Sequence, residues 1–225
     1  MSYVFVRHAQ PEWIRDGLNI DDPCLTALGR AQADRLGRRF QRSSADVVLV
    51  SNLRRARETA EPIADALGVE PVVCDWLAEI TSPVWEGTPV EHVERLFREH
   101  REKPLDEMWE GLEGGESFHD FHRRVTNGVQ AFIEGQGDER ISDEPALWQL
   151  AEPERRVIVV AHAGTNAAAI GYLLGIRPVP WEWERFVSFH ASISSIEPIP
   201  ISAGHAFSLA RFSDVAHLPP GLQTR

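Results

Sequence analysis

The alternation of short apolar runs with stretches of helical period predicts an α/β protein. Apolar runs of strand length lie at 3–6, 45–50, 71–74, 157–161, 189–196 and 206–212. Apolar positions of helical period lie between several of them, at 27–41, 56–67, 118–132 and 165–174. Because this alternation favours βαβ units, we expect a three-layer α/β/α sandwich around a largely parallel central sheet. No linker or repeat divides the chain, which predicts a single domain over residues 1–225.

Individual residues mark the ends of the predicted helices. Thr26 is a good N-cap for the first helix, and Gly68 and Gly175 are natural stops for the second and the fourth. Pro62 suits the second helix only if the regular helix begins a few residues before it. The stretch EHVERLFREHREKP, residues 91–104, predicts a further amphipathic helix.

Two stretches show no regular period. Residues 135–156 are rich in Asp, Glu, Pro and Arg, which indicates a solvated surface excursion. The segment 213–225 contains two consecutive prolines and a glycine and is expected to be irregular. Five histidines are expected at the surface: His92, His100, His119, His122 and His205.

Composition excludes several classes of protein. No apolar stretch approaches the roughly 20 residues that span a bilayer, so we expect no membrane segment. Cys24 and Cys74 are too few for a disulfide framework, which favours a reducing, cytoplasmic location. The net charge of −11 argues against nucleic acid or an anionic membrane as a partner. It also disfavours polyphosphate substrates, although screening over about 8 Å lets arginines dominate inside a pocket.

Two predicted strands deliver a histidine to their carboxyl ends. The run at 3–6 leads into Arg7 and His8, and the run at 157–161 leads into His162 and small residues. In open α/β sheets, ligands bind at the carboxyl edge of the strands. Two imidazoles and an arginine at this edge predict a pocket for an anion such as a phosphoryl group.

More positive charge follows the strand at 45–50. The stretch SNLRRARETA places Arg54, Arg55 and Arg57 at the start of the next helix. A helix N-terminus favours anions, and an arginine there adds a planar fork of donors that matches phosphate oxygens. From spacing alone, three neighbouring arginines fit a solvated face equally well, and we expect Arg57 on the surface.

Six motifs occur in an order that is shared with a known family. They are VRHAQPEW, LTALGRAQA, SNLRRARETA, the glutamate of WLAEITSPVWEG, GGESF and VVAHAGT. Together, from Tyr3 to about Gly175, they resemble the histidine phosphatase superfamily, the phosphoglycerate-mutase-like proteins. SDVAHL at 213–218 is similar to the end of many phosphatase-type members. The family often has glycine after the first histidine, whereas Ala9 stands here, so a slightly altered loop is expected.

The resemblance implies a role for each of five residues. His8 matches the nucleophilic histidine that becomes phosphorylated, and Arg7 and Arg55 match the two arginines of the phosphate clamp. His162 matches the second histidine, which also contacts the phosphate, and Glu79 matches the acidic proton donor. The family pattern Leu-x-Arg-Ala selects Arg55 among its neighbours.

These residues suit phosphoryl transfer without a metal or a cofactor. The two arginines and His162 can supply positive charge to the equatorial oxygens. His8 must be neutral at its attacking nitrogen, with the other nitrogen donating to a fixed group such as a backbone carbonyl. Glu79 is expected to carry a proton when the alkoxide leaves, and then to act as base for the attacking water.

Other roles for these residues remain open. His8, His162 and Glu79 are types that bind zinc, although no His-x-x-x-His spacing supports this and two arginines would repel the cation. His162 also fits a satisfied core histidine, and Glu86 is an alternative proton donor.

The motifs favour a hydrolase, a phosphomonoesterase of the histidine acid phosphatase type that acts on a small phosphorylated metabolite. Mutase-type members carry Asn after the Trp, whereas Ile14 follows Trp13 here. No arginine-rich stretch beyond Gly87 resembles the mutases' grip on the substrate carboxylate. A phosphoglycerate-mutase-type isomerase and a non-catalytic module that binds phosphate ligands are the alternatives, although binding alone does not require the nucleophile.

Further residues are candidates for contacts with the substrate. Beyond the phosphate clamp, the expected substrate contacts are Gln10, Ala163, Trp85 and His190. Trp13 and Ile14 are also expected to border the leaving group, which indicates a partly apolar substrate, although tryptophans there suit a core equally well. Trp181 and Trp183 are candidates for a contact in a homodimer.

Overall fold

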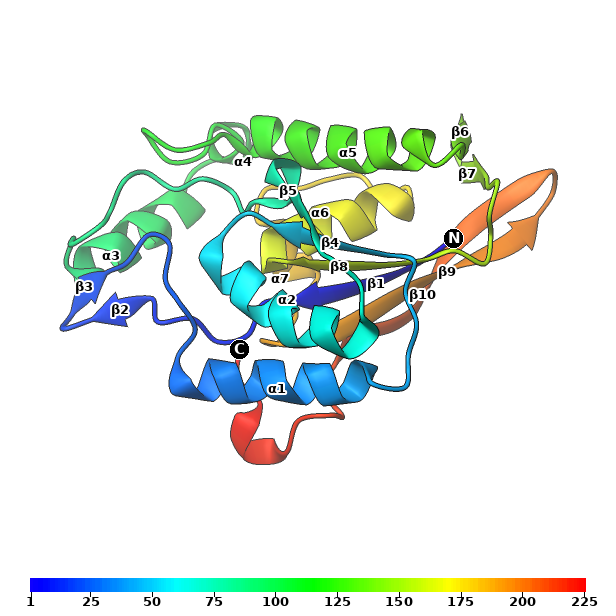
Figure 1. Ribbon diagram of the computed structural model, residues 1–225. Helices are drawn as coiled ribbons and strands as arrows, with labels where there is room; N and C mark the ends of the chain where they lie inside the picture. Colours follow the sequence, from blue (N-terminus) through cyan, green and yellow to red (C-terminus); the bar gives the residue numbers. More distant parts are fainter.

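An eight-stranded sheet runs through the protein, with helices on both of its faces (Figure 1). The computed structural model describes residues 1–225. The strands of this sheet are β1 (Ser2–Arg7), β4 (Val47–Ser51), β5 (Val72–Cys74), β6 (Glu139–Asp143), β7 (Ala146–Gln149), β8 (Arg156–Ala161), β9 (Ile193–Ile201) and β10 (Gly204–Asp214). Two short strands, β2 (Ile14–Arg15) and β3 (Leu18–Asn19), pair separately. The predicted α/β class is confirmed.

The sheet is parallel in one half and antiparallel in the other. Its strand order is β5-β4-β8-β1-β9-β10-β7-β6. The first four strands run parallel to one another, and the remaining strands continue the sheet in antiparallel pairs. The expected largely parallel sheet therefore describes the half built from βαβ units. The antiparallel half contains two hairpins, β6–β7 and β9–β10.

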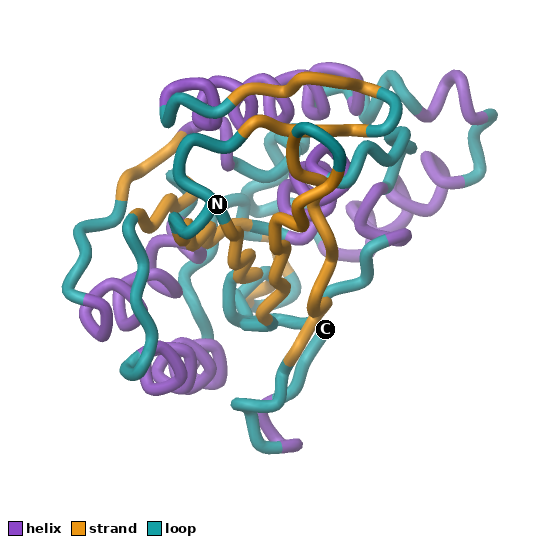
Figure 2. The backbone as a smooth tube through the Cα atoms, turned by 90° about the vertical axis from the view of Figure 1, so that its right-hand side faces the viewer, coloured by secondary structure: helices purple, strands orange, loops and turns teal.

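Helices cover both faces of the sheet, as a view along the strands shows (Figure 2). One face carries α1 (Ala27–Phe40) and α2 (Arg54–Leu67), and the other carries α5 (Phe118–Gly135) and α6 (Ala163–Leu173). The remaining helices are α3 (Val90–Arg101), α4 (Leu105–Met108), α7 (Glu182–Arg185) and the 3-10 turns η1 (Asp75–Leu77) and η2 (Pro220–Leu222). None of the helices is long and apolar enough to cross a membrane.

Successive residues of the central strands point to opposite faces, which produces two apolar cores. Tyr3 and Phe5 pack in the core beneath α5 and α6, whereas Val4 and Val6 pack in the core beneath α1 and α2. Strands that are covered on both faces need apolar residues at every position. This requirement explains the unbroken apolar runs that predict these strands.

The helix ends agree with the predicted signals, except at the proline. The Thr26 hydroxyl accepts a hydrogen bond from the Gly29 N–H at 2.9 Å, and Gly68 ends α2 with a left-handed φ of 66°. Pro62 lies well inside α2, so a helix that starts only a few residues before it is wrong. A Cβ on Gly37 would lie 2.7 Å from the Pro62 carbonyl oxygen, so glycine lets α1 approach α2 closely.

The prediction of a solvated excursion at 135–156 is wrong. This segment leaves α5 and forms the β6–β7 hairpin, which completes the sheet. The Trp148 side chain on β7 is fully buried, with its ring centroid 5.6 Å from that of Phe207. Strand β6 alternates exposed and half-buried residues, so its charged residues are those of a solvated edge strand.

Two histidines that were predicted at the surface are buried. His100 on α3 stacks on the Phe118 ring at a centroid distance of 6.0 Å. His122 on α5 lies 5.7 Å from the Trp109 ring. Burial lowers the pKa of both imidazoles. The prediction fails because polar neighbours in sequence do not reveal which helix face the tertiary structure covers.

Candidate active site

The carboxyl ends of β1 and β8 bring His8 and His162 together. The two strands are parallel neighbours with Arg7 opposite Ala161, so the residue that follows each strand lies at the same edge. The His8 N–H donates to the Ala161 carbonyl at 2.8 Å. The two imidazole centroids lie 5.1 Å apart, and both rings are buried. Strand register alone therefore places one histidine beside the other.

The carbonyl of the next residue fixes the His8 ring in one tautomer. Its Nδ1 lies 2.8 Å from the Ala9 carbonyl oxygen, and because a carbonyl only accepts, Nδ1 donates and Nε2 keeps its lone pair. The pKa of His8 is well below its ordinary value because the ring is buried and lies beside His162 and two arginines. A neutral ring with a free Nε2 is the form that a nucleophile requires.

Ala9 fits the loop after His8 without a left-handed backbone. It is not among the residues with positive φ, so the altered loop expected from its replacement of glycine carries no such strain. Its N–H donates to the Thr59 hydroxyl at 3.0 Å, and this hydroxyl donates to the Arg55 carbonyl at 2.7 Å. These two bonds fasten the histidine loop to the first turns of α2.

Arg55 is buried at the start of α2 with part of its hydrogen-bonding capacity free. Its guanidinium lies 4.6 Å from the centroid of the Trp13 ring, and its Nη1 lies 3.5 Å from an Asp22 oxygen. Its Nε and Nη1 have no hydrogen-bond partner. Burial lowers the pKa of Arg55 to about 10, so the side chain remains charged at neutral pH. Buried, charged and unpartnered N–H groups suit an anion.

Arg7 reaches the same edge of the sheet and is held by two groups from the β9 side. One terminal nitrogen donates to the Ser188 carbonyl at 2.5 Å, and the other lies 3.2 Å from His190 Nε2. Since a guanidinium only donates, His190 Nε2 accepts and its Nδ1 donates to the Thr224 hydroxyl at 3.0 Å. The Arg7 Nε is buried without a partner, and burial lowers the Arg7 pKa to about 10. The C-terminal segment thus fixes the ring that positions Arg7.

Acidification is expected to destabilise the fold through His190. Burial and then the charge of Arg7 lower the pKa of His190 from 6.5 to about 3. Between these pH values His190 is protonated in the unfolded chain but not in the folded chain. Its contribution to the free energy of unfolding is therefore fully present above pH 6.5 and is lost as the pH decreases. The cost from pH 7 to pH 5 is about 2 kcal/mol. In urea unfolding, His190→Gln should lose about that much less than the wild type over this interval.

The exposed His92 provides the matched control for this measurement. His92→Gln should keep the wild-type loss of stability on acidification. If His190→Gln loses as much stability as the wild type, the buried neutral state of His190 is wrong.

His162 is fully buried and hydrogen bonded on one side only. Its Nε2 lies 2.7 Å from the Ser51 hydroxyl at the end of β4, and its Nδ1 has no partner. Burial, followed by the charges of Arg55 and Arg7, lowers the pKa of His162 well below its ordinary value. The unpaired Nδ1 leaves this ring with one nitrogen free to meet a ligand.

Glu79 lies between the helix that follows His162 and the arginines. One carboxylate oxygen accepts the Gly164 N–H at 2.9 Å, and the other accepts the Ile80 N–H at 3.0 Å. A Cβ on Gly164 would lie 2.5 Å from the carboxylate, so only glycine admits Glu79 here. The negative charge of Glu79 raises the pKa of both Arg7 and Arg55, which offsets part of the effect of their burial.

The structure does not bring every candidate to this position. Glu86 is exposed, and its carboxylate accepts the Asp21 N–H at 2.9 Å. The Gln10 side-chain oxygen accepts the Thr26 hydroxyl at 2.8 Å, which ties it to the start of α1. Ala163 directly follows His162 as the first residue of α6, so its backbone lies next to the histidine pair. The neighbouring arginines Arg54 and Arg57 are exposed, which confirms the surface position expected for Arg57.

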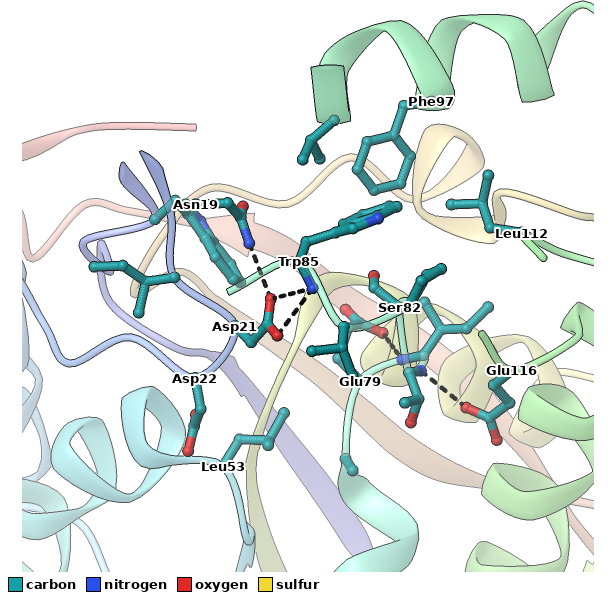
Figure 3. A pocket seen from close by; sticks show the side chains of 18 of the residues that line it. Asn19, Asp21, Asp22, Leu53, Glu79, Ser82, Trp85, Phe97, Leu112 and Glu116 are labelled. Carbon is teal, nitrogen blue, oxygen red and sulfur yellow. Dashed lines mark hydrogen bonds between the residues drawn. The ribbon is translucent and has the colours of Figure 1, made fainter. Parts of the chain in front are cut away.

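A cavity of about 600 Å³ opens beside Arg55 and Glu79 (Figure 3). Trp85 lies in its wall, where the sequence predicts a border to the leaving group, and Trp13 and Ile14 also line it. Trp181 and Trp183, which were candidates for a dimer contact, line the cavity as well. The Trp13 ring lies 6.3 Å from the His8 ring, so the cavity adjoins the histidine pair.

Several residues that hold the site in place were not among the predicted site residues. Ser51, Thr59 and Ser188 each contact one of the five candidate residues through a single hydroxyl or carbonyl group. Ser51 and Thr59 lie within the motif SNLRRARETA, and Ser51 also ends a strand, so these signals could have found them. Thr224 contacts His190 only because the C-terminal segment folds back over the sheet edge, and no local pattern encodes that return.

Comparisons with known proteins identify the family of this chain. The family model of the histidine phosphatase superfamily (branch 1) matches residues 3–202. Phosphoserine phosphatase 1 of Hydrogenobacter thermophilus is 34% identical over 179 residues, which cover 78% of this chain and 77% of that protein. A probable phosphoglycerate mutase of Yersinia enterocolitica is 31% identical over 147 residues, 60% of this chain and 64% of that protein.

A solved structure is also similar over most of the chain. A mycobacterial glucosyl-3-phosphoglycerate phosphatase in complex with inorganic phosphate matches with a TM-score of 0.69 and 25% identity, covering 97% of this chain and 99% of that one. An α/β sandwich that presents two histidines at the ends of parallel strands, with two arginines close by, is typical of a class of proteins that act on phosphate groups. This chain belongs to the histidine phosphatase superfamily.

Proposed function

We propose that the protein hydrolyses phosphomonoesters in two displacements through a phosphohistidine on His8, without a metal ion. In the first, Nε2 forms a bond to phosphorus while the ester P–O bond breaks and Glu79 gives a proton to the departing alkoxide. In the second, water attacks phosphorus, the N–P bond breaks and Glu79 takes the proton of the water. Arg7, Arg55 and His162 hold the equatorial oxygens in both steps.

The tautomer of His8 is the observation that carries this proposal. Its Nδ1 is occupied by the Ala9 carbonyl, so the lone pair of Nε2 is free within a pocket that also holds two cationic side chains. A module that only binds phosphate needs the cations but has no use for a fixed nucleophile. The lowered pKa of His8 favours a neutral ring with an unprotonated Nε2, the form that a phosphomonoesterase of the histidine acid phosphatase type requires.

The cavity favours a hydrolase over a mutase. A phosphoglycerate mutase must also hold the carboxylate of its substrate, yet Arg55 is the only Lys or Arg side chain among the residues that line the cavity. The relatives named as phosphatases act on small phosphorylated compounds, according to their names. We therefore infer a small phosphorylated metabolite as the substrate and free phosphate as a product.

Removal of metal ions is expected to leave the activity unchanged. The described residues contain no group of three His, Cys, Asp or Glu side chains placed to hold a metal ion. Release of phosphate from p-nitrophenyl phosphate should therefore continue at the same rate after dialysis against EDTA. A loss of activity that zinc restores would favour the zinc alternative for His8, His162 and Glu79. Interconversion of phosphoglycerate isomers without release of phosphate would favour the mutase.

A further inference from the structure

We propose that the cavity beside Glu79 selects phosphomonoesters whose alcohol portion is bulky, apolar and free of negative charge. This inference rests on the proposed function and specifies its substrate class. It depends on three features of the cavity wall: the aromatic rings, the engagement of every carboxylate with the protein, and the lack of a second free cation.

Aromatic rings from three separate segments form one side of the cavity. The Trp85 and Phe97 centroids lie 5.2 Å apart, and Phe97 lies 5.8 Å from Trp181. Trp183 lies a further 5.1 Å from Trp181. Figure 3 shows the Phe97 and Trp85 rings beside each other on the side of the cavity across from Asp22. Of the 25 lining residues, 15 are hydrophobic, so a group that leaves water here meets mainly apolar surface.

The carboxylates that line the cavity are all engaged with the protein. Asp21 accepts the Trp85 and Glu86 backbone N–H groups, each at 3.1 Å. Glu116 pairs with Arg124 at 2.7 Å. Asp22 accepts the Arg54 N–H and faces Arg55, and Glu79 accepts two backbone N–H groups. These carboxylates accept hydrogen bonds from the backbone N–H groups around the cavity, so none of these donors is free to bind a substrate.

No cation in the cavity is available for a second anionic group. Arg55 is the one lining residue with a fixed positive charge, and the phosphoryl group requires it in the proposed function. The Arg124 guanidinium already donates hydrogen bonds to the Glu116 carboxylate and to the Trp76 and Ala78 carbonyls. A substrate carboxylate would therefore lose its hydration without gaining a partner, in a cavity already lined by the carboxylates of Asp21, Asp22 and Glu116.

A pair of substrates that differ only in charge tests this inference. Hexyl phosphate and its analogue with a terminal carboxylate both release a primary alcohol, so the chemistry of departure is alike. The wild-type kcat/KM should favour hexyl phosphate by about 10²-fold, because a carboxylate without a partner loses its hydration. Equal kcat/KM values would overturn the inference but leave the proposed function standing. No turnover of either ester or of p-nitrophenyl phosphate would contradict the proposed function itself.

A charge added to the cavity should relax this preference. Val84 lines the cavity and is 89% exposed, so Val84→Arg adds a cation without disturbing the core. The ratio of the two kcat/KM values should shift toward the carboxylated ester by about tenfold. Val72→Arg, on the exposed edge strand β5 and outside the cavity lining, makes the same substitution and should leave the ratio unchanged. An unchanged ratio in Val84→Arg, or an equal shift in both variants, would contradict the inference.

Discussion

His8→Ala is expected to lower kcat for p-nitrophenyl phosphate by at least about 10⁴-fold, since no other side chain replaces the nucleophile. His162, the nearest imidazole, cannot replace His8 as the nucleophile. Its Nε2 is hydrogen bonded to Ser51, and it follows a different strand. The arginines remain in place, so the variant should still bind inorganic phosphate. After incubation with a radiolabelled substrate, the wild-type protein should carry a base-stable radiolabel, and the variant should not.

The matched control for His8→Ala is His92→Ala, which removes an exposed imidazole from α3. This variant should keep wild-type turnover and wild-type labelling. If His8→Ala keeps turnover within tenfold of the wild type, the two-displacement mechanism is wrong. If it loses phosphate binding together with turnover, loss of the folded site has to be separated from loss of the nucleophile by a urea unfolding curve.

The positions of the two histidines could be predicted because strand pairing encodes them. A residue that follows a buried parallel strand lies at the carboxyl edge whatever the loops do, and β1 and β8 are neighbours in register. The same logic places Arg55 at the start of the helix that follows β4, next to β8. His190 is at this edge for a different reason, since it precedes the antiparallel strand β9, which pairs with β1.

The antiparallel half of the fold could not be predicted so well. The charged composition of 135–156 conceals an edge hairpin, whose outward residues are polar because solvent covers them. The apolar residues Ile141, Leu147, Trp148 and Leu150 are the contrary signals in that segment, and Trp148 and Leu150 are buried. Contacts between segments far apart in the sequence could not be predicted either, and the hydrogen bond between Thr224 and His190 is one example.

Net charge proved a poor guide to the local electrostatics of the site. The chain carries −11, yet the side chains closest to His8 are imidazoles and arginines, whose presence lowers its pKa. Most acidic residues lie on the surface, where screening shortens their reach to about 8 Å. Burial therefore lets a few arginines define an anion site inside an acidic protein.

Glu79→Gln is expected to separate substrates by how much their leaving groups need a proton. An alkyl phosphate releases a basic alkoxide, so kcat/KM should fall by about 10²–10⁴-fold when the general acid is lost. p-Nitrophenolate departs without protonation, and kcat/KM for its ester should fall by less than about tenfold. The amide keeps one oxygen to accept the Gly164 N–H, so the fold of the site should survive. If Glu79 is also the base for water, the phosphoenzyme should accumulate during turnover of p-nitrophenyl phosphate.

Glu86→Gln is the control that decides between the two neighbouring glutamates. Glu86 is exposed and bonded to the Asp21 N–H, so its replacement should leave both substrates at wild-type rates. An equal loss on both esters in Glu79→Gln would indicate damage to phosphate binding, because the charge of Glu79 also acts on the two arginines. A selective loss on the alkyl ester in Glu86→Gln instead would transfer the role of general acid to Glu86. Only a loss that is both selective for the alkyl ester and confined to position 79 supports the mechanism.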